Sequence, residues 1–96
     1  QEEFLEVALA EPAHLSAVEI YETYNPGAIS SIELITERGE RLAMQPGGAT
    51  TRRTHRLDFA CTQERIAAIR VTLDSQQVAG WNELDAIGAQ PCKATR

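Results

Sequence analysis

The sequence predicts a single all-β domain over residues 1–96, and three observations support this. Ninety-six residues are enough for one domain and leave no room for a second. From about residue 15 onward, apolar residues recur mainly with a period of two, which is typical of half-buried strands. These short runs are separated by turn-forming residues. No run approaches the roughly 20 apolar residues of a membrane-spanning helix, and no basic-then-apolar leader opens the chain, so we expect a soluble domain without a transmembrane segment.

Seven strands are predicted, and in most of them alternate residues share an apolar face. They cover residues 4–9, 15–21, 29–36, 41–44, 54–59, 69–73 and 84–89. In the second strand Val18 and Ile20 share a face while Glu19 points away, and in the third Ile32 and Leu34 point inward. The antiparallel sheets expected from such strands bury one face of each.

The first and fifth strands follow the same alternation. Leu5, Val7 and Leu9 share one face, so we expect the first strand to be half-buried. In the fifth strand His55 lies on the same face as its apolar neighbours and is expected to point toward the core. Three segments rich in Gly, Pro, Asn or charged residues are predicted to be turns or loops: residues 25–27, 37–40 and 46–51.

Two segments favour a helix by composition alone. Residues 1–11 and 62–70 are rich in Glu, Gln, Leu, Ala and Arg, which are good helix formers. We predict mainly strand in both, because the alternating, β-branched run at residues 69–73 needs a sheet and leaves little room for a long helix before it. One or two helical turns around residues 62–67 are the alternative.

The two cysteines are expected to form a disulfide. Cys61 and Cys92 lack the close spacing of a zinc site or a redox pair, and buried free thiols are the alternative. If the strand ending near residue 73 and the strand beginning near residue 82 paired as antiparallel neighbours, the two cysteines would meet at the open end. This inference fails if a jelly-roll connection places those strands in different sheets. A disulfide would place the protein in an oxidising compartment: secreted, periplasmic or on a cell surface.

Charge is unevenly distributed along the chain. Residues 1–24 hold six Glu and no Lys or Arg, and the whole chain has a net charge of −5, which argues against nucleic acid as a partner. Arg52, Arg53 and Arg56 lie around His55 after a glycine-rich loop, a placement that suits an anion such as a carboxylate, sulfate or phosphate. The alternative is a solvated strand end that balances the acidic segment.

Two motifs carry a family resemblance. They are I-Y-E-T-Y-N-P-G-A-I at residues 20–29, and V-T-L-D at residues 71–74 followed by V-A-G-W-N-E-L-D-A-I at residues 78–87. Over about residues 4–89 the chain resembles the discoidin-like (coagulation factor 5/8 type C-like) branch of the galactose-binding-like β-sandwiches. The resemblance implies an antiparallel jelly-roll β-sandwich that serves as a recognition module on extracytoplasmic proteins, most often for glycans. Such domains usually begin with a further strand and loops, so we expect a fragment of a longer chain or a part supplied by another chain.

The same motifs supply the candidate ligand residues. Tyr24, Asn25, Trp81 and Asn82 are candidates for contacts with a glycan, with Arg52 and Arg53 for an anionic ligand. Each has a structural alternative: turn chemistry for Asn25, and packing against the core or its rim for Trp81 and Tyr24. Glu83 resembles a calcium ligand of related modules, although one carboxylate supplies only part of the six to eight oxygens that calcium takes, and a solvated Glu83 is the alternative.

No catalytic motif is present. The sequence has no nucleophile elbow, P-loop, dinucleotide fingerprint or H-E-x-x-H, so we expect a protein that is not an enzyme. The favoured function is recognition of a glycan or another cell-surface ligand through loops at one end of the sandwich. The alternatives are a protein–protein assembly module that uses exposed strand edges, and an accessory domain that stabilises a neighbouring domain.

Overall fold

The computed structural model describes residues 2–24, 29–44, 54–74 and 83–94. Within these ranges the chain forms strands and no helix, so the all-β prediction is confirmed for this part of the chain. None of the described residues belongs to a helix that would be long and apolar enough to cross a membrane. The strands are β1 (Glu2–Ala13), β2 (Leu15–Tyr24), β3 (Ile29–Thr36), β4 (Arg41–Met44), β5 (Thr54–Asp58), β6 (Ile66–Asp74) and β7 (Glu83–Pro91).

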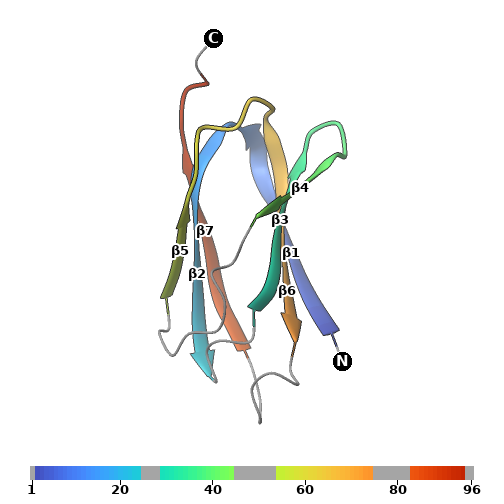
Figure 1. Cartoon of the computed structure of the whole chain (residues 1–96), viewed down its shortest axis with the longest axis vertical. Helices are drawn as coiled ribbons and strands as arrows, with labels where there is room; N and C mark the ends of the chain where they lie inside the picture. Colours follow the sequence, from blue (N-terminus) through green and yellow to red (C-terminus); the bar gives the residue numbers. More distant parts are fainter. Residues whose placement is uncertain (1, 25–28, 45–53, 75–82, 95–96) are drawn as a thin grey trace.

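The strands form two antiparallel sheets that face one another (Figure 1). One sheet has the order β1-β6-β3-β4 and the other the order β5-β2-β7. Only β3 and β4 follow each other in the chain and also pair, whereas every other connection passes from one sheet to the other. Neighbours in a sheet therefore come from distant parts of the sequence. This arrangement is consistent with a β-sandwich.

The core lies between the sheets and draws on both of them. Its buried residues are Leu15, Val18, Ile20, Ile29, Ile32, Leu34, Ile66, Ile69 and Val71. The inward positions predicted in the second and third strands are confirmed, since these side chains are at most 1% exposed. Glu19, between two of the buried residues of β2, has a side chain that is 36% exposed, as the period of two requires.

The first strand is more exposed than predicted. Leu5 and Val7 are register partners of Val71 and Ile69, so they lie on the core-facing side of the sheet as expected. They are nevertheless 40% and 36% exposed, and Phe4 on the other face is 58% exposed. The expectation of a half-buried strand is confirmed at Leu9, which packs partly buried against the core, and wrong at Leu5 and Val7, because β1 is the edge strand of a four-stranded sheet that faces a three-stranded one. The periodicity identified the face but not the width of the opposing sheet.

Both segments with a helical composition are extended or irregular. Residues 2–13 form β1, and β6 begins at Ile66 after a non-helical stretch, which confirms the prediction of strand. The pairing of β1 with β6 is regular from Glu2 to Ala8 and shifts register between Ala8 and Ala13. Pro12 lies in this irregular stretch, where a residue without a backbone N–H disrupts the ladder least.

Cys61 and Cys92 form the predicted disulfide, with Cα atoms 6.0 Å apart. The hairpin that would have explained it does not exist, because β6 and β7 belong to different sheets. Both cysteines are held instead at the corner between β1 and β2. The amide of Cys92 donates a hydrogen bond of 2.9 Å to the carbonyl of His14.

Thr62, next to Cys61, completes this corner. Its amide donates to the carbonyl of Leu15 at 2.9 Å, and its hydroxyl oxygen accepts from the amide of Leu15 at 3.0 Å. The Nδ1 atom of His14 lies 2.8 Å from the carbonyl oxygen of Thr62, so Nδ1 carries the proton of this hydrogen bond. We call these residues the corner clamp: His14, Leu15, Cys61, Thr62 and Cys92. It joins the β1–β2 corner, the β5–β6 connection and the end of β7.

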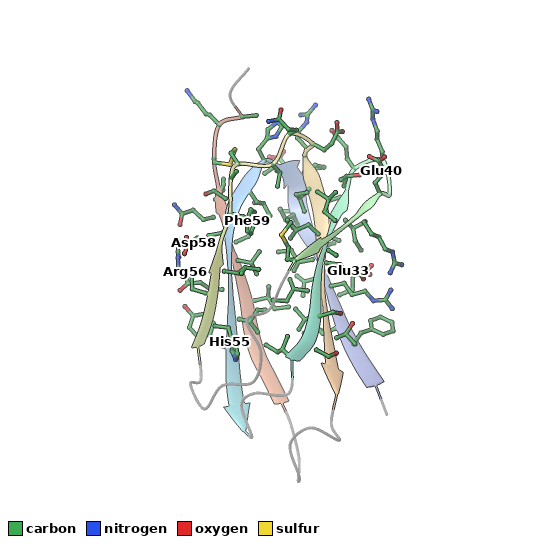
Figure 2. The ribbon with its side chains drawn as sticks, in the orientation of Figure 1. Glu33, Glu40, His55, Arg56, Asp58 and Phe59 are labelled. Atoms are coloured by element: carbon green, nitrogen blue, oxygen red, sulfur yellow. A yellow bond between two sulfur atoms is a disulfide. The ribbon has the colours of Figure 1, made fainter. Side chains whose placement is uncertain are left out.

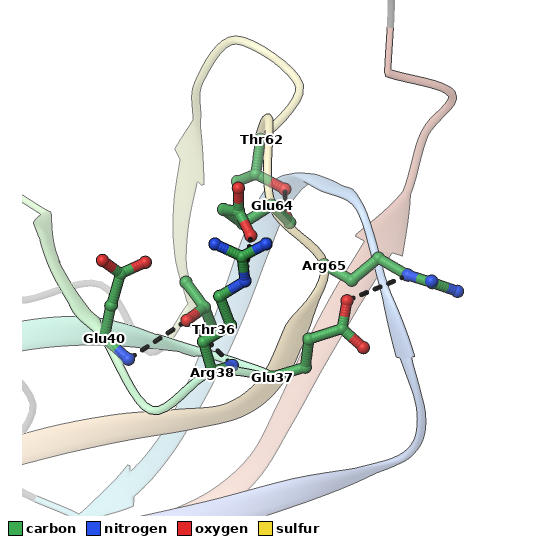
Figure 3. Close-up of polar contacts among 7 residues, drawn as sticks. All are labelled: Thr36, Glu37, Arg38, Glu40, Thr62, Glu64 and Arg65. Atoms are coloured by element: carbon green, nitrogen blue, oxygen red, sulfur yellow. Dashed lines mark hydrogen bonds and ion pairs between the residues drawn. The ribbon is translucent and has the colours of Figure 1, made fainter.

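The predicted hairpin at residues 37–40 is confirmed and packs beside this connection (Figure 3). The buried hydroxyl of Thr36 accepts hydrogen bonds from the amides of Arg38 and Glu40 at 3.3 and 3.1 Å. The amide of Glu37 donates to the carbonyl of Arg65 at 2.9 Å, and the side chains of these two residues form an ion pair of 3.1 Å. The hairpin is thereby attached to the chain that leads into β6.

Removing the disulfide should lower the stability of the fold strongly. We expect the Cys61→Ala/Cys92→Ala double variant to lose about 3–4 kcal/mol of unfolding free energy, because the cross-link closes a long loop of the unfolded chain. Urea denaturation followed by circular dichroism measures this loss, with the reduced wild-type protein as the control. Two reactive thiols in unfolded, unreduced wild-type protein would contradict the disulfide itself.

Candidate functional site

The backbone brings two of the predicted site residues together. Tyr24, the last residue of β2, and Glu83, the first residue of β7, are register partners in the three-stranded sheet. The side chains of both lie outside the described residues. The other predicted ligand residues fall entirely outside them: Asn25, Arg52, Arg53, Trp81 and Asn82. Their roles therefore remain predictions.

The strands that flank these residues meet at one end of the sandwich. In Figure 1, β2 and β6 end there, and β3, β5 and β7 begin there. The molecule measures 44 × 22 × 20 Å, and the corner clamp lies at the opposite end of its long axis. The residues predicted from the two sequence motifs are thus joined to strand ends that lie near one another, far from the disulfide.

A calcium site is not supported by the described residues. Among them no group of three or more His, Cys, Asp or Glu side chains is arranged to hold a metal ion. Glu83 contributes only its backbone to the described part of the chain. Calcium takes six to eight oxygen ligands, and one carboxylate supplies at most two of them.

The two described members of the basic group, His55 and Arg56, lie on opposite faces of β5. His55 is the register partner of the buried Ile20, so it lies on the core-facing side, as predicted. Arg56 and Asp58 lie on the outer face of the three-stranded sheet (Figure 2). Since adjacent residues of a strand point to opposite faces, His55 and Arg56 cannot bind one ligand together.

The guanidinium group of Arg56 contacts polar side chains from all three strands of its sheet. Its Nε lies 3.1 Å from a carboxylate oxygen of Asp58, its Nη2 donates to the side-chain oxygen of Gln90 at 2.6 Å, and its Nη1 lies 3.5 Å from a carboxylate oxygen of Glu19. Two carboxylates therefore surround one guanidinium group. This environment compensates the charge of Arg56 and is unfavourable for an anionic ligand.

A shallow depression lies beside this network on the outer face. It has a volume of about 300 Å³ and is lined by Ala17, Glu19, Arg56, Gly88, Ala89, Gln90 and Pro91. The depression forms where the side chains are small: Ala17 on the central strand β2, and Gly88 and Ala89 on the edge strand β7. A Cβ atom built on Gly88 would meet no atom within 4 Å, so the absence of that side chain leaves the floor open.

An exposed aromatic side chain lies on the same face. Tyr21, two residues beyond Glu19 in β2, is 39% exposed. An aromatic ring beside fixed hydrogen-bonding groups offers both an apolar surface and polar partners to a neutral hydroxyl-rich ligand. We call this group the outer-face site: Glu19, Tyr21, Arg56, Gly88 and Gln90.

The sequence did not identify the outer-face site. Its residues come from β2, β5 and β7, and only the register between these strands brings them together. The outward positions of Glu19 and Arg56 were visible in the alternation, but the partner of Arg56 across the sheet, Gln90, was not. Strand pairing over such sequence distances is a property of the tertiary fold.

No protein-family model matches the chain, and no curated protein matches its sequence.

Two glycines should respond in opposite ways to the same substitution. Gly88→Ala is expected to raise the unfolding free energy by about 0.4–1 kcal/mol, because it restricts the unfolded chain at a position with open space. Gly39→Ala is expected to lower it by about 1–2 kcal/mol, because Gly39 has a φ of +88°. Urea denaturation of both variants measures the difference. Destabilisation by Gly88→Ala would show that the depression is not open.

Proposed function

We propose that the chain is a non-catalytic recognition module whose ligand is a glycan. The observation that carries this proposal is the outer-face site, where an exposed tyrosine lies on the same sheet face as a depression lined in part by the hydrogen-bonded and ion-paired side chains of Glu19, Arg56 and Gln90. A sugar ring has an apolar face that suits Tyr21, and its hydroxyl groups match the donors and acceptors of Arg56, Glu19 and Gln90. A neutral ligand also fits the compensated charge of Arg56.

The fold supports the same proposal at a coarser level. Among the described strands, five of the six successive pairs lie in different sheets, a pattern that would suit the jelly-roll sandwich proposed from the motifs. The end of the sandwich that carries Tyr24 and Glu83 is the second place where this module would hold its ligand, through Asn25, Trp81 and Asn82.

A binding role is favoured over catalysis because of the openness of this surface. The carboxylates of Glu19 and Asp58 are partly exposed and already paired with Arg56. Catalytic acids and bases act in sites that exclude water, where burial shifts their pKa values and strengthens their electrostatic effects. The disulfide favours an oxidising, extracytoplasmic compartment, where glycans are exposed to recognition.

Sugar titration of two variants separates the two candidate locations. We expect wild-type protein to bind a glycan on an array or in calorimetry, and Tyr21→Ala to weaken binding about tenfold through loss of the stacking surface, with Tyr21→Phe as the matched control. Gly88→Val should also weaken binding, since its side chain fills the depression.

Three other results would change or contradict this proposal. Loss of binding in Trp81→Ala, with Tyr21→Ala unaffected, would move the ligand to the end of the sandwich. A lower melting temperature after treatment with a chelator would support a calcium ion bound by Glu83. Absence of saturable binding across a glycan array would contradict the proposal.

A further inference from the structure

The outer edge of β1 is free along its first half. β1 pairs with β6 on one side, and no described strand pairs with its other side. From Glu2 to Ala8 the strand is regular, so its outward backbone N–H and C=O groups form a continuous row. An edge of this kind is a template on which a further strand can add.

Between Glu2 and Ala8 this edge has no Lys, proline or bulge, and its charged residues are Glu2, Glu3 and Glu6. Lys residues, prolines, bulges and short length normally prevent another chain from pairing with an edge. The register shift and the proline of β1 come only after Ala8. The other edge strands β4, β5 and β7 have four, five and nine residues, whereas β1 has twelve. The exposed large apolar residues of β1 are Phe4, Leu5 and Val7.

The outer face of the same sheet carries a row of alternating charges. From β1 to β4 the row consists of Glu6, Arg70, Glu33 and Arg41. Arg70 lies 4.0 Å from Glu6 and is the register partner of Glu33, and Arg41 lies 3.3 Å from Glu33. Figure 2 shows Glu33 on this outer face, opposite to the face that carries the core.

The row ends at the open edge with a negative charge. The side chain of Glu6 is 42% exposed, and its nearest cation, Arg70, is also held by the ring of Phe4, with 3.5 Å between the guanidinium carbon and the ring centroid. A strand added beyond β1 would continue the alternation if it placed a cation opposite Glu6.

A second copy of this chain does not meet that requirement. Two β1 strands paired with each other would bring together segments that contain only acidic charges, since residues 1–24 hold six Glu and no Lys or Arg. Like charges on directly opposed strands are unfavourable. The charge of the edge therefore selects a different partner.

We propose that residues 2–8 of β1 bind an extended segment of another protein in which Lys or Arg alternates with apolar residues. The partner adds as a strand to the edge of the four-stranded sheet. Its apolar residues cover Leu5 and Val7 beyond the reach of the opposing sheet, and its cations lie beside Glu6 on the outer face. This surface and its peptide ligand are separate from the outer-face site, which belongs to the other sheet.

Synthetic peptides test this proposal on the wild-type protein. A peptide of alternating lysine and valine should bind with one-to-one stoichiometry in calorimetry and more weakly as salt is raised. An alternating glutamate and valine peptide should bind at least about tenfold more weakly, because it opposes Glu6. The lysine peptide with every backbone nitrogen methylated should not bind, because it cannot donate to the strand edge.

Two pairs of variants locate the peptide on β1. Val7→Lys should weaken the lysine peptide at least about tenfold, while Ala43→Lys, on the opposite edge strand of the same sheet, should leave binding within about twofold. Glu6→Gln should weaken binding of the lysine peptide. Glu40→Gln removes one negative charge from the β3–β4 hairpin and should leave binding of this peptide unchanged. Figure 2 shows Glu40 on that hairpin, far along the sheet from the free edge.

Three results would overturn the proposal. Equal binding of the glutamate peptide or of the methylated peptide to wild-type protein excludes strand addition to an acidic edge, whether or not the Val7 variant folds. Binding that is unchanged in Glu6→Gln excludes this edge as the site. A wild-type dimer in sedimentation that is lost in Val7→Lys assigns the edge to a second copy instead.

Discussion

The corner clamp is the constraint on which the rest of the fold depends. The chain changes sheets at every connection except β3–β4, so few sequence neighbours stabilise each other by pairing. The clamp joins three distant parts of the chain through the Cys61–Cys92 disulfide and the paired hydrogen bonds of Leu15 and Thr62. A domain of this size buries a modest core, so a covalent link at one end contributes a large share of its stability.

With one end fixed by the clamp, the two proposed binding surfaces lie elsewhere on the sandwich. The outer-face site belongs to β5, β2 and β7, whereas the free edge belongs to the four-stranded sheet. One surface combines a tyrosine with compensated charges and suits a neutral ligand. The other combines exposed apolar side chains with a row of alternating charges that ends at Glu6, and suits a cationic peptide. A module with both properties would connect a glycan-bearing surface to a protein partner.

The sequence predicted local features well and long-range features poorly. The alternation gave the inward faces of β2 and β3 and the orientation of His55, and the turn residues gave the β3–β4 hairpin. It did not give the exposure of Leu5, which depends on the width of the opposing sheet. The disulfide was predicted from the spacing of the cysteines and forms, but the hairpin considered for it does not. The contact of Arg56 with Gln90, 34 residues apart in the sequence, depends on β2 pairing with both β5 and β7.

Residue-by-residue amide hydrogen exchange of the disulfide-bonded protein is the most direct test of the clamp. The amides of Leu15, Thr62 and Cys92 all donate hydrogen bonds within it. If the clamp holds the sheets together, these amides exchange only through global unfolding, with the same free energy of exchange as the amide of Ile69 in the central strand β6. Exchange of the three amides through local opening, at a free energy well below that of Ile69, would contradict this account.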